Sequence, residues 1–91
     1  MEFEWDEAKA KANLARHKVS FDEAKTVFED PLFLMFADID HSFEERRFII
    51  LGESNKGKLL VVAFTGRENV TRIISARPST AAERKNYEEE I

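Results

Sequence analysis

The amino-acid sequence predicts an α+β fold with two N-terminal helices, a four-stranded antiparallel meander sheet and a short C-terminal helix. Two capping boxes support the helices, because Ser20 and Thr80 are each followed, at the third position after them, by a glutamate. Apolar segments separated by short polar turns fill the chain between residues 32 and 77. Connections this short favour antiparallel neighbours.

Length and composition limit the class of protein. A chain of 91 residues can bury one modest core, so we expect a single domain over residues 1–91. The absence of cysteine excludes disulfides and thiolate metal sites, and two histidines argue against a structural zinc site, so we expect no metal and no cofactor. No apolar run approaches a membrane span, and the acidic start does not resemble a signal peptide. We therefore expect a cytoplasmic protein with no membrane partner.

The charge balance is acidic. Fourteen basic and eighteen acidic residues give a net charge of −4, which by itself disfavours a nucleic-acid partner. Several of the acids lie at the two ends of the chain, at Glu2, Glu4 and Glu88–Glu90. A local basic patch between the ends is therefore compatible with the net charge.

The first helix is expected from an N-cap at Asp6 to about His17. Its alanine face, formed by Ala8, Ala12 and Ala15, would let it pack closely on a sheet or a second helix. Another face collects the polar side chains Lys9, Asn13, Arg16 and His17. The alternative for this polar face is a solvated surface whose last-turn cations complement the helix dipole.

Two further helices follow from the capping boxes. The second helix is expected from Phe21 to about Glu29, where Asp30-Pro31 ends it. The last helix is expected from Thr80 to about Glu90, and it is short enough to depend on docking rather than on propensity.

Three strands are expected over residues 32–37, 46–51 and 58–64, with a polar loop at 38–45 and a turn at 52–57. The continuous apolar run Leu59–Phe64 is typical of a central strand. The alternating segment Phe3-Glu4-Trp5 is compatible with a short edge strand.

The fourth strand, Val70–Arg77, is the segment around which we expect the functional site. Its β-branched isoleucines favour an extended backbone, and Pro78 should end it because proline cannot donate to a ladder. Regular alternation would place Ile73, Ser75 and Arg77 on one face. It would place the other members, Val70, Arg72, Ile74 and Ala76, on the opposite face.

Each face of this strand would thus carry an isoleucine and an arginine. An arginine is costly to bury without a partner. At least one arginine is therefore expected at a strand end or over a site. The alternative is that both side chains reach solvent at the strand ends.

Four groups of residues, taken together and in order, are more specific than any one of them alone. They are Trp5-Asp6-x-x-Lys9-x-x-x-Asn13-x-x-Arg16-His17-x-x-x-Phe21, then Asp40-His41-Ser42 with Glu45-Arg46 and Gly52, then Ile73-Ile74-Ser75-Ala76-Arg77, and last Glu83-Arg84-x-x-Tyr87-Glu88. With these groups, the chain resembles the BrnT family, the toxin half of a bacterial type II toxin–antitoxin pair. The resemblance covers nearly the whole chain.

The resemblance implies a RelE-like ribonuclease fold, in which helices pack on one face of a small antiparallel sheet and RNA binds on the sheet and its rim. It also implies a BrnA-type antitoxin with a ribbon-helix-helix region, and promoter DNA that is bound only through the complex. The residue after the histidine is usually glycine in this family, whereas this chain has Lys18. A lysine in a left-handed helix cap costs about 1 kcal/mol relative to glycine.

The chemistry implied by the resemblance is metal-free RNA cleavage. The substrate 2′-hydroxyl attacks the adjacent phosphorus and leaves a 2′,3′-cyclic phosphate, which requires a general base, a general acid and cations for the phosphorane. Arginine suits a phosphate because its planar fork makes paired hydrogen bonds. We expect Arg77 to be the leading transition-state cation, with Ser75 beside it.

The remaining site residues have supporting roles in this hypothesis. Lys9 and Arg16, with Asn13 between them, would guide RNA along the first helix. His17 or His41 would supply acid–base chemistry. The weaker candidates are Glu83, whose capping box already explains it, and Arg72, which is either a second site cation or a structural partner of Glu45.

A function of another class remains open: a BrnT-like module without enzymatic activity, which binds the antitoxin and helps to repress the operon. The acidic net charge and Lys18 favour this module, whereas Arg77, His17 and Lys9 favour the ribonuclease. If the site is shared, Lys9, Arg16 or His17 lies on the same side of the molecule as Arg77. A segment of the antitoxin is then expected to cover this surface.

Overall fold

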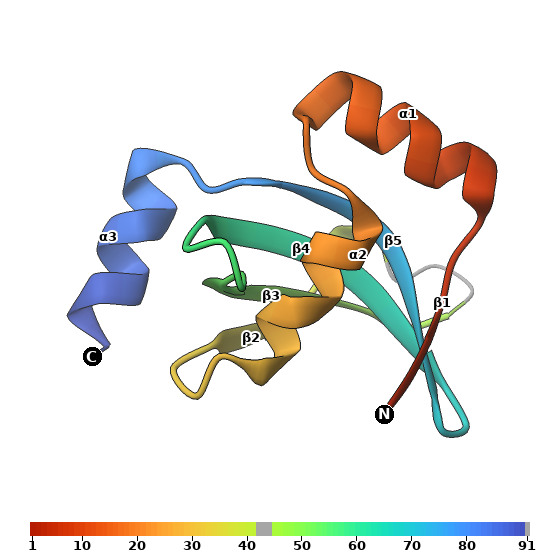
Figure 1. Ribbon diagram of the computed structural model, residues 1–91. Coiled ribbons are helices and arrows are strands. Elements are labelled where there is room, and N and C mark those ends of the chain that lie inside the picture. Colours follow the sequence, from red (N-terminus) through yellow and green to blue (C-terminus); the bar gives the residue numbers. More distant parts are fainter. Residues whose placement is uncertain (42–44, 91) are drawn as a thin grey trace.

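A five-stranded mixed sheet in the order β1-β5-β4-β3-β2 forms the centre of the fold (Figure 1). The computed structural model describes residues 1–41 and 45–90. The strands are β1 (Glu2–Glu4), β2 (Leu34–Ala37), β3 (Arg47–Glu53), β4 (Leu59–Arg67) and β5 (Val70–Pro78). Strands β2 to β5 form an antiparallel meander with β4 at the centre of the sheet, as the sequence predicted.

The prediction of a four-stranded, wholly antiparallel sheet was wrong at one edge. β1 adds a fifth strand and pairs parallel to β5, with Glu2 opposite Val70 and Glu4 opposite Arg72. A parallel partner needs a long crossover connection rather than a turn, and here the whole meander separates the two strands. β5 also runs one residue further than predicted, to Pro78.

The helical elements are α1 (Glu7–His17), α2 (Phe21–Ala24), η1 (Lys25–Glu29), η2 (Ile39–His41) and α3 (Ala81–Glu89). The bounds of α1 agree with the prediction, and the Asp6 carboxylate caps it by accepting from the Lys9 N–H. The helix predicted from Phe21 to Glu29 is instead divided into the short α-helix α2 and the 3₁₀-helix η1. The Thr26 hydroxyl donates to the Glu23 carbonyl at 2.7 Å, a local bond that competes with regular α-helix. No helix in the described part of the chain is both long and apolar enough to cross a membrane.

The packing of α1 corrects the prediction about its faces. The alanine face of Ala8, Ala12 and Ala15 is exposed, whereas Asn13 is buried and Ala10 and His17 are half-buried. The reason is the position of the helix, which lies along the outer side of β5 rather than flat on the sheet (Figure 1). A polar side chain at that edge can bond to the strand backbone, and alanine cannot.

The core has two parts on opposite faces of the sheet. The larger cluster packs α2 and η1 on one face and contains Val19, Phe21, Ala24, Val27, Ile50, Leu60, Val62, Phe64, Ile73 and Ala76. The smaller cluster, on the opposite face, contains Leu51, Leu59, Val61 and Tyr87 of α3. Helices therefore cover both faces, whereas the resemblance implied that they cover one.

A β-bulge interrupts β5 and changes which of its residues share a face. Phe64 pairs with Ile73 and Ala63 with Ser75, which leaves Ile74 as the extra residue. As a result Ile73 and Ala76 are buried in the same cluster, although regular alternation predicted opposite faces. Beyond the bulge the alternation is regular, so Ser75 and Arg77 share the face opposite to Ala76.

A hydrogen-bonded node fixes α3 against β3. The Asp30 carboxylate accepts from the Tyr87 hydroxyl at 2.6 Å, and from the backbone N–H groups of Glu53 and Leu32, each at 2.8 Å. Burial alone would raise the pKa of Asp30, but these three bonds outweigh it and lower the pKa. A Cβ on Gly52 would come within 2.9 Å of the Val27 Cγ1 and 3.1 Å of the Asp30 Oδ2, so the close approach of these groups requires glycine.

Candidate functional site

The candidate site is a groove of about 200 Å³ between α1 and the outer side of β5. We call it the α1–β5 groove. It is lined by Lys9, Ala12, Asn13, Arg16, His17, Ile74 and Ser75. Five of these residues had been predicted as site residues from the sequence, and the fold brings them together from elements more than fifty residues apart.

Asn13 holds the groove together. Its side-chain amide donates to the Ala76 carbonyl at 2.8 Å and to the Val19 carbonyl at 2.9 Å, and its Oδ1 accepts from the Ala76 N–H at 3.0 Å. The amide thus takes the place of a neighbouring strand at Ala76. Asn13 was predicted to contact RNA, but it is 7% exposed and both of its amide hydrogens are already donated. Its role in the described structure is structural.

The other polar groups of the groove are available to a ligand. Within residues 1–41 and 45–90, the side chains of Lys9, Arg16, His17 and Ser75 make no hydrogen bond or ion pair. Lys9, Arg16 and Ser75 are exposed, and His17 is half-buried. Two cations, an imidazole and a hydroxyl therefore face one small groove in a protein whose net charge is −4.

Arg77 is held by a glutamate of α3. Its Nη1 and Nη2 donate to the two carboxylate oxygens of Glu83, each at 2.8 Å, and Nη1 also donates to the Pro78 carbonyl at 3.2 Å. A guanidinium has five N–H donors. The remaining donors, on Nε and Nη2, lie along one side of the guanidinium, and the Arg77 side chain is 40% exposed.

This ion pair changes the role expected for Glu83. The bond from Arg77, helped by the Thr80 N–H, lowers the pKa of Glu83 to about 2 against the cost of burial. The same pair raises the pKa of Arg77. A carboxylate that stays ionised and bonded across the neutral range is a poor general base. The geometry therefore makes Glu83 a group that orients Arg77, in addition to its predicted role in the capping box.

Arg77 lies next to the groove along β5. Ser75 lines the groove, and Arg77 follows two residues later on the same face, a separation of about 7 Å along a strand. Arg77 and the α1–β5 groove therefore lie beside each other along β5.

Two predicted residues lie elsewhere. Arg72 donates to Glu4 of β1 at 2.8 Å, and Glu45, which was considered as its partner, instead accepts from Arg67 at 2.9 Å. Arg72 therefore joins β5 to β1.

His41 follows β2 in the short helix η2. β2 ends at Ala37, which lies in the same row across the sheet as Phe48 of β3, Phe64 of β4 and Ile73 of β5. The chain then continues past that end of the sheet to His41. Arg77 is aligned with the opposite end of β2, through Val61 and Leu51 to Leu34. The backbone thus separates His41 from Arg77 both along and across the strands. Ser42, its partner in the predicted motif, lies outside the described residues.

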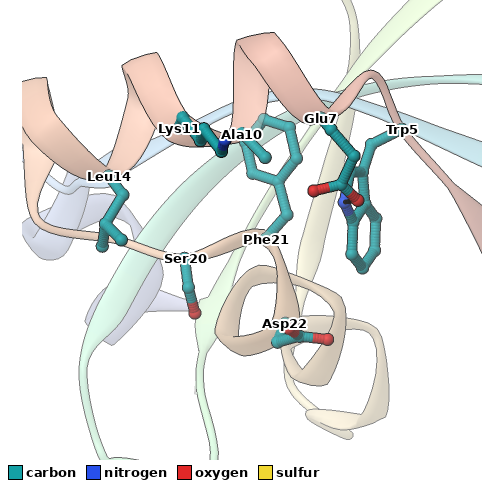
Figure 2. A pocket seen from close by; sticks show the side chains of 8 residues that line it. All are labelled: Trp5, Glu7, Ala10, Lys11, Leu14, Ser20, Phe21 and Asp22. Carbon is teal, nitrogen blue, oxygen red and sulfur yellow. Dashed lines mark hydrogen bonds between the residues drawn. The ribbon is translucent and has the colours of Figure 1, made fainter.

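A second pocket of about 200 Å³ lies on the other side of α1 (Figure 2). Figure 2 shows Trp5 beside Glu7, to which its indole N–H donates at 3.1 Å, and Lys11 and Phe21 line the same pocket. Asp22 also lines this pocket. Because it carries acids as well as Lys11, it is a poorer site for phosphate than the α1–β5 groove.

Ile74 lines the groove but was not predicted as a site residue. It is the extra residue of the β-bulge in β5, and no glycine or other residue in that segment indicates a bulge. Among the described residues, no three His, Cys, Asp or Glu side chains gather as metal ligands would.

A family model described as "Ribonuclease toxin, BrnT, of type II toxin-antitoxin system" matches residues 5–83. The crystal structure of the Brucella abortus ribonuclease toxin BrnT is similar in fold, with a TM-score of 0.68 and 23% sequence identity, over 88% of this chain and 97% of that chain. No curated protein sequence matches the chain.

Proposed function

Because the chain belongs to the BrnT family, the ribonuclease toxins of type II toxin–antitoxin systems, we propose that it cleaves RNA at the α1–β5 groove and the adjacent Arg77. The observation that supports this site is the group of side chains without protein partners: Lys9, Arg16, His17 and Ser75. Such a cluster attracts phosphate, because it holds two cationic side chains and none of the residues that line the groove is acidic.

We assign phosphate binding to Lys9 and Arg16, which project from one side of α1. Lysine and arginine contacts to the backbone position a nucleic acid without reading its sequence. His17 is the candidate acid–base group, because its imidazole lines the groove and an imidazole can accept or donate a proton. We prefer His17 to His41 because the backbone places His41 at the other end of the sheet.

The proposed reaction uses the substrate's own 2′-hydroxyl. Its oxygen attacks the adjacent phosphorus and loses its proton to a base, and the bond to the 5′-oxygen breaks as that oxygen takes up a proton. The products are a 2′,3′-cyclic phosphate and a 5′-hydroxyl. Arg77 would donate its free Nε–H and Nη2–H to the phosphorane oxygens, and Glu83 keeps the guanidinium plane fixed while it does so.

The BrnT family implies an antitoxin partner. We propose that the partner is BrnA-type, with a ribbon-helix-helix region through which the complex contacts promoter DNA. The second candidate function is a binding module without catalysis. One specific observation favours it: the arginines of β4 and β5, namely Arg67, Arg72 and Arg77, are all paired with glutamates, which reduces the positive charge offered to RNA.

RNA cleavage by the purified chain, in the presence of a metal chelator, tests the proposal. Products should carry 2′,3′-cyclic phosphates. Arg77→Lys and Arg77→Ala should both reduce turnover by about 10²–10³-fold, because lysine keeps the charge but loses the planar fork. Arg67→Lys is the matched control, since Arg67 is also paired with a glutamate but lies at the distal end of β4.

A second pair of variants tests the groove itself. Lys9→Ala should weaken RNA binding, whereas Lys11→Ala on the other side of the same helix should not. Cleavage that a chelator abolishes would overturn the metal-free mechanism. A purified chain that binds antitoxin but never cleaves RNA would support the binding module instead.

A further inference from the structure

The exposed apolar residues of the protein are concentrated at one edge of the sheet. Among the described residues, seven large hydrophobic side chains are exposed, and five of them lie in β2 and the residues beside it: Leu32, Phe33, Met35, Phe36 and Ile39. Single exposed hydrophobics are ordinary, but a contiguous group of them marks an interaction surface. This cluster therefore requires an explanation that the RNA site does not provide.

β2 is also the last strand of the described sheet on this side. It pairs with β3 on one side, and in the described part of the chain no strand pairs with its other side. The opposite side of the sheet is covered. β1 pairs with the start of β5, and the Asn13 amide forms hydrogen bonds with the backbone N–H and carbonyl of Ala76. An open, apolar edge strand exposes backbone donors and acceptors that another strand can use.

A groove of about 330 Å³ runs between this edge and α3. We call it the β2–α3 groove, and it is lined by Leu34, Met35, Phe36, Asn86, Glu89 and Glu90. Its floor is thus apolar, and its rim is a pair of acids at the end of α3. An extended peptide with alternating apolar side chains and a Lys or Arg near the helix matches both features.

We propose that an extended segment of the antitoxin pairs with β2 as an added strand and fills the β2–α3 groove. Its apolar side chains contact Leu34 and Phe36, and a basic side chain meets Glu89 and Glu90. The proposal depends on the proposed function only for the identity of the partner. A second copy of this chain is a poor occupant, because it would bring the same acids and a net charge of −4 to the interface.

The position of the groove connects it to the site. α3 begins beside Arg77, through Glu83, and its later turns reach β2 through Asn86 and Glu89. Six residues of helix separate Glu83 from Glu89, which is about 9 Å. An antitoxin segment that continues from the groove along α3 therefore reaches the Arg77–Glu83 pair, which makes this edge a route to neutralisation of the toxin.

The test is titration of the purified chain with the BrnA-type antitoxin proposed above as its partner. Met35→Lys and Phe36→Lys should each weaken binding by about tenfold or more, because each places a charge among the apolar residues of the proposed interface, and a few such residues usually provide most of the affinity. The control is Leu14→Lys, since Leu14 is as exposed as Phe36, at 49%, but lies on α1 away from the groove. The double variant Glu89→Lys/Glu90→Lys should weaken binding without altering β2, which guards against a strand variant that misfolds.

Hydrogen exchange provides the second readout. The β2 amides that do not bond to β3 should become protected in the complex. Wild-type affinity in both β2 variants, or unchanged β2 exchange, would overturn the proposal. So would a dimer of the free chain that Met35→Lys dissociates, because a second copy would then occupy the edge. If the unchanged chain does not cleave RNA but the β2 and α3 variants bind the antitoxin more weakly as expected, the ribonuclease proposal fails and the proposed interface is supported.

Discussion

Replacement of Asn13 by alanine separates its structural role from the role in RNA binding that the sequence suggested. The substitution removes three hydrogen bonds, two to Ala76 and one to Val19. Both partner residues are buried, at 0% and 1% exposed, so water cannot replace the amide freely. The polar backbone groups of Ala76 and Val19 are then left without partners.

Each such bond contributes roughly 1 kcal/mol, so Asn13→Ala should lower the free energy of unfolding by about 3 kcal/mol. For a domain of this size the melting temperature should fall by roughly 15–20 °C. Urea denaturation followed by circular dichroism measures the change, and Lys9→Ala, one turn earlier on the exposed side of α1, should change the stability by less than about 0.5 kcal/mol. A loss below about 1 kcal/mol in Asn13→Ala, accompanied by weaker RNA binding, would refute the structural role and restore Asn13 as an RNA contact.

Three further results are expected. Lys18 ends α1 in the left-handed region, with φ 61°, so Lys18→Gly should raise the free energy of unfolding by about 1 kcal/mol in the same denaturation assay. The pKa of Glu83 is lowered from 4.5 to about 2, so stability that is present above pH 4.5 should be lost as the pH falls toward 2. The stability of Glu83→Gln should depend less steeply on pH over that window. Equal slopes in the variant and the unchanged protein would contradict the Arg77–Glu83 ion pair. Burial and the bond to Asp30 raise the pKa of Tyr87 to about 12, so an absorbance titration of this single tyrosine should show its ionisation well above pH 10. Tyr87→Phe should lower the free energy of unfolding by about 1.5–3 kcal/mol, because it removes the hydrogen bond from the hydroxyl to the Asp30 carboxylate.

Local signals predicted most of the elements. The Asp6 cap and the capping box at Thr80 place the starts of α1 and α3, and the apolar run in β4 identifies the central strand. These features depend on residues close together in the sequence. A short edge strand was considered at Phe3–Trp5, and β1 lies at Glu2–Glu4, but its parallel pairing with β5 could not be predicted because it depends on contacts between distant parts of the chain.

Part of the candidate site was also predictable, because three of its residues lie close together in the sequence. The spacing of Lys9, Arg16 and His17 places them on one side of any helix, whatever that helix packs against. The orientation of α1 was not predictable, and it decides that Asn13 faces the strand rather than the solvent. The pairing of Arg77 with Glu83 follows from the turn between β5 and α3, which brings together residues that no helical or strand period relates.

The parallel pairing of β1 with β5 has a consequence for the order of events during synthesis. Glu4 and Arg72 are 68 residues apart, and the Asn13 bonds to Ala76 span 63 residues. Contacts of such separation require closure of a long loop, and they form late compared with local turns. The α1 side of the α1–β5 groove is synthesised early, but the β5 side is missing until β5 has left the ribosome, so a nascent chain cannot assemble this groove while the meander is still being made. The groove that we propose as the RNA site is therefore assembled only after β5 has been synthesised.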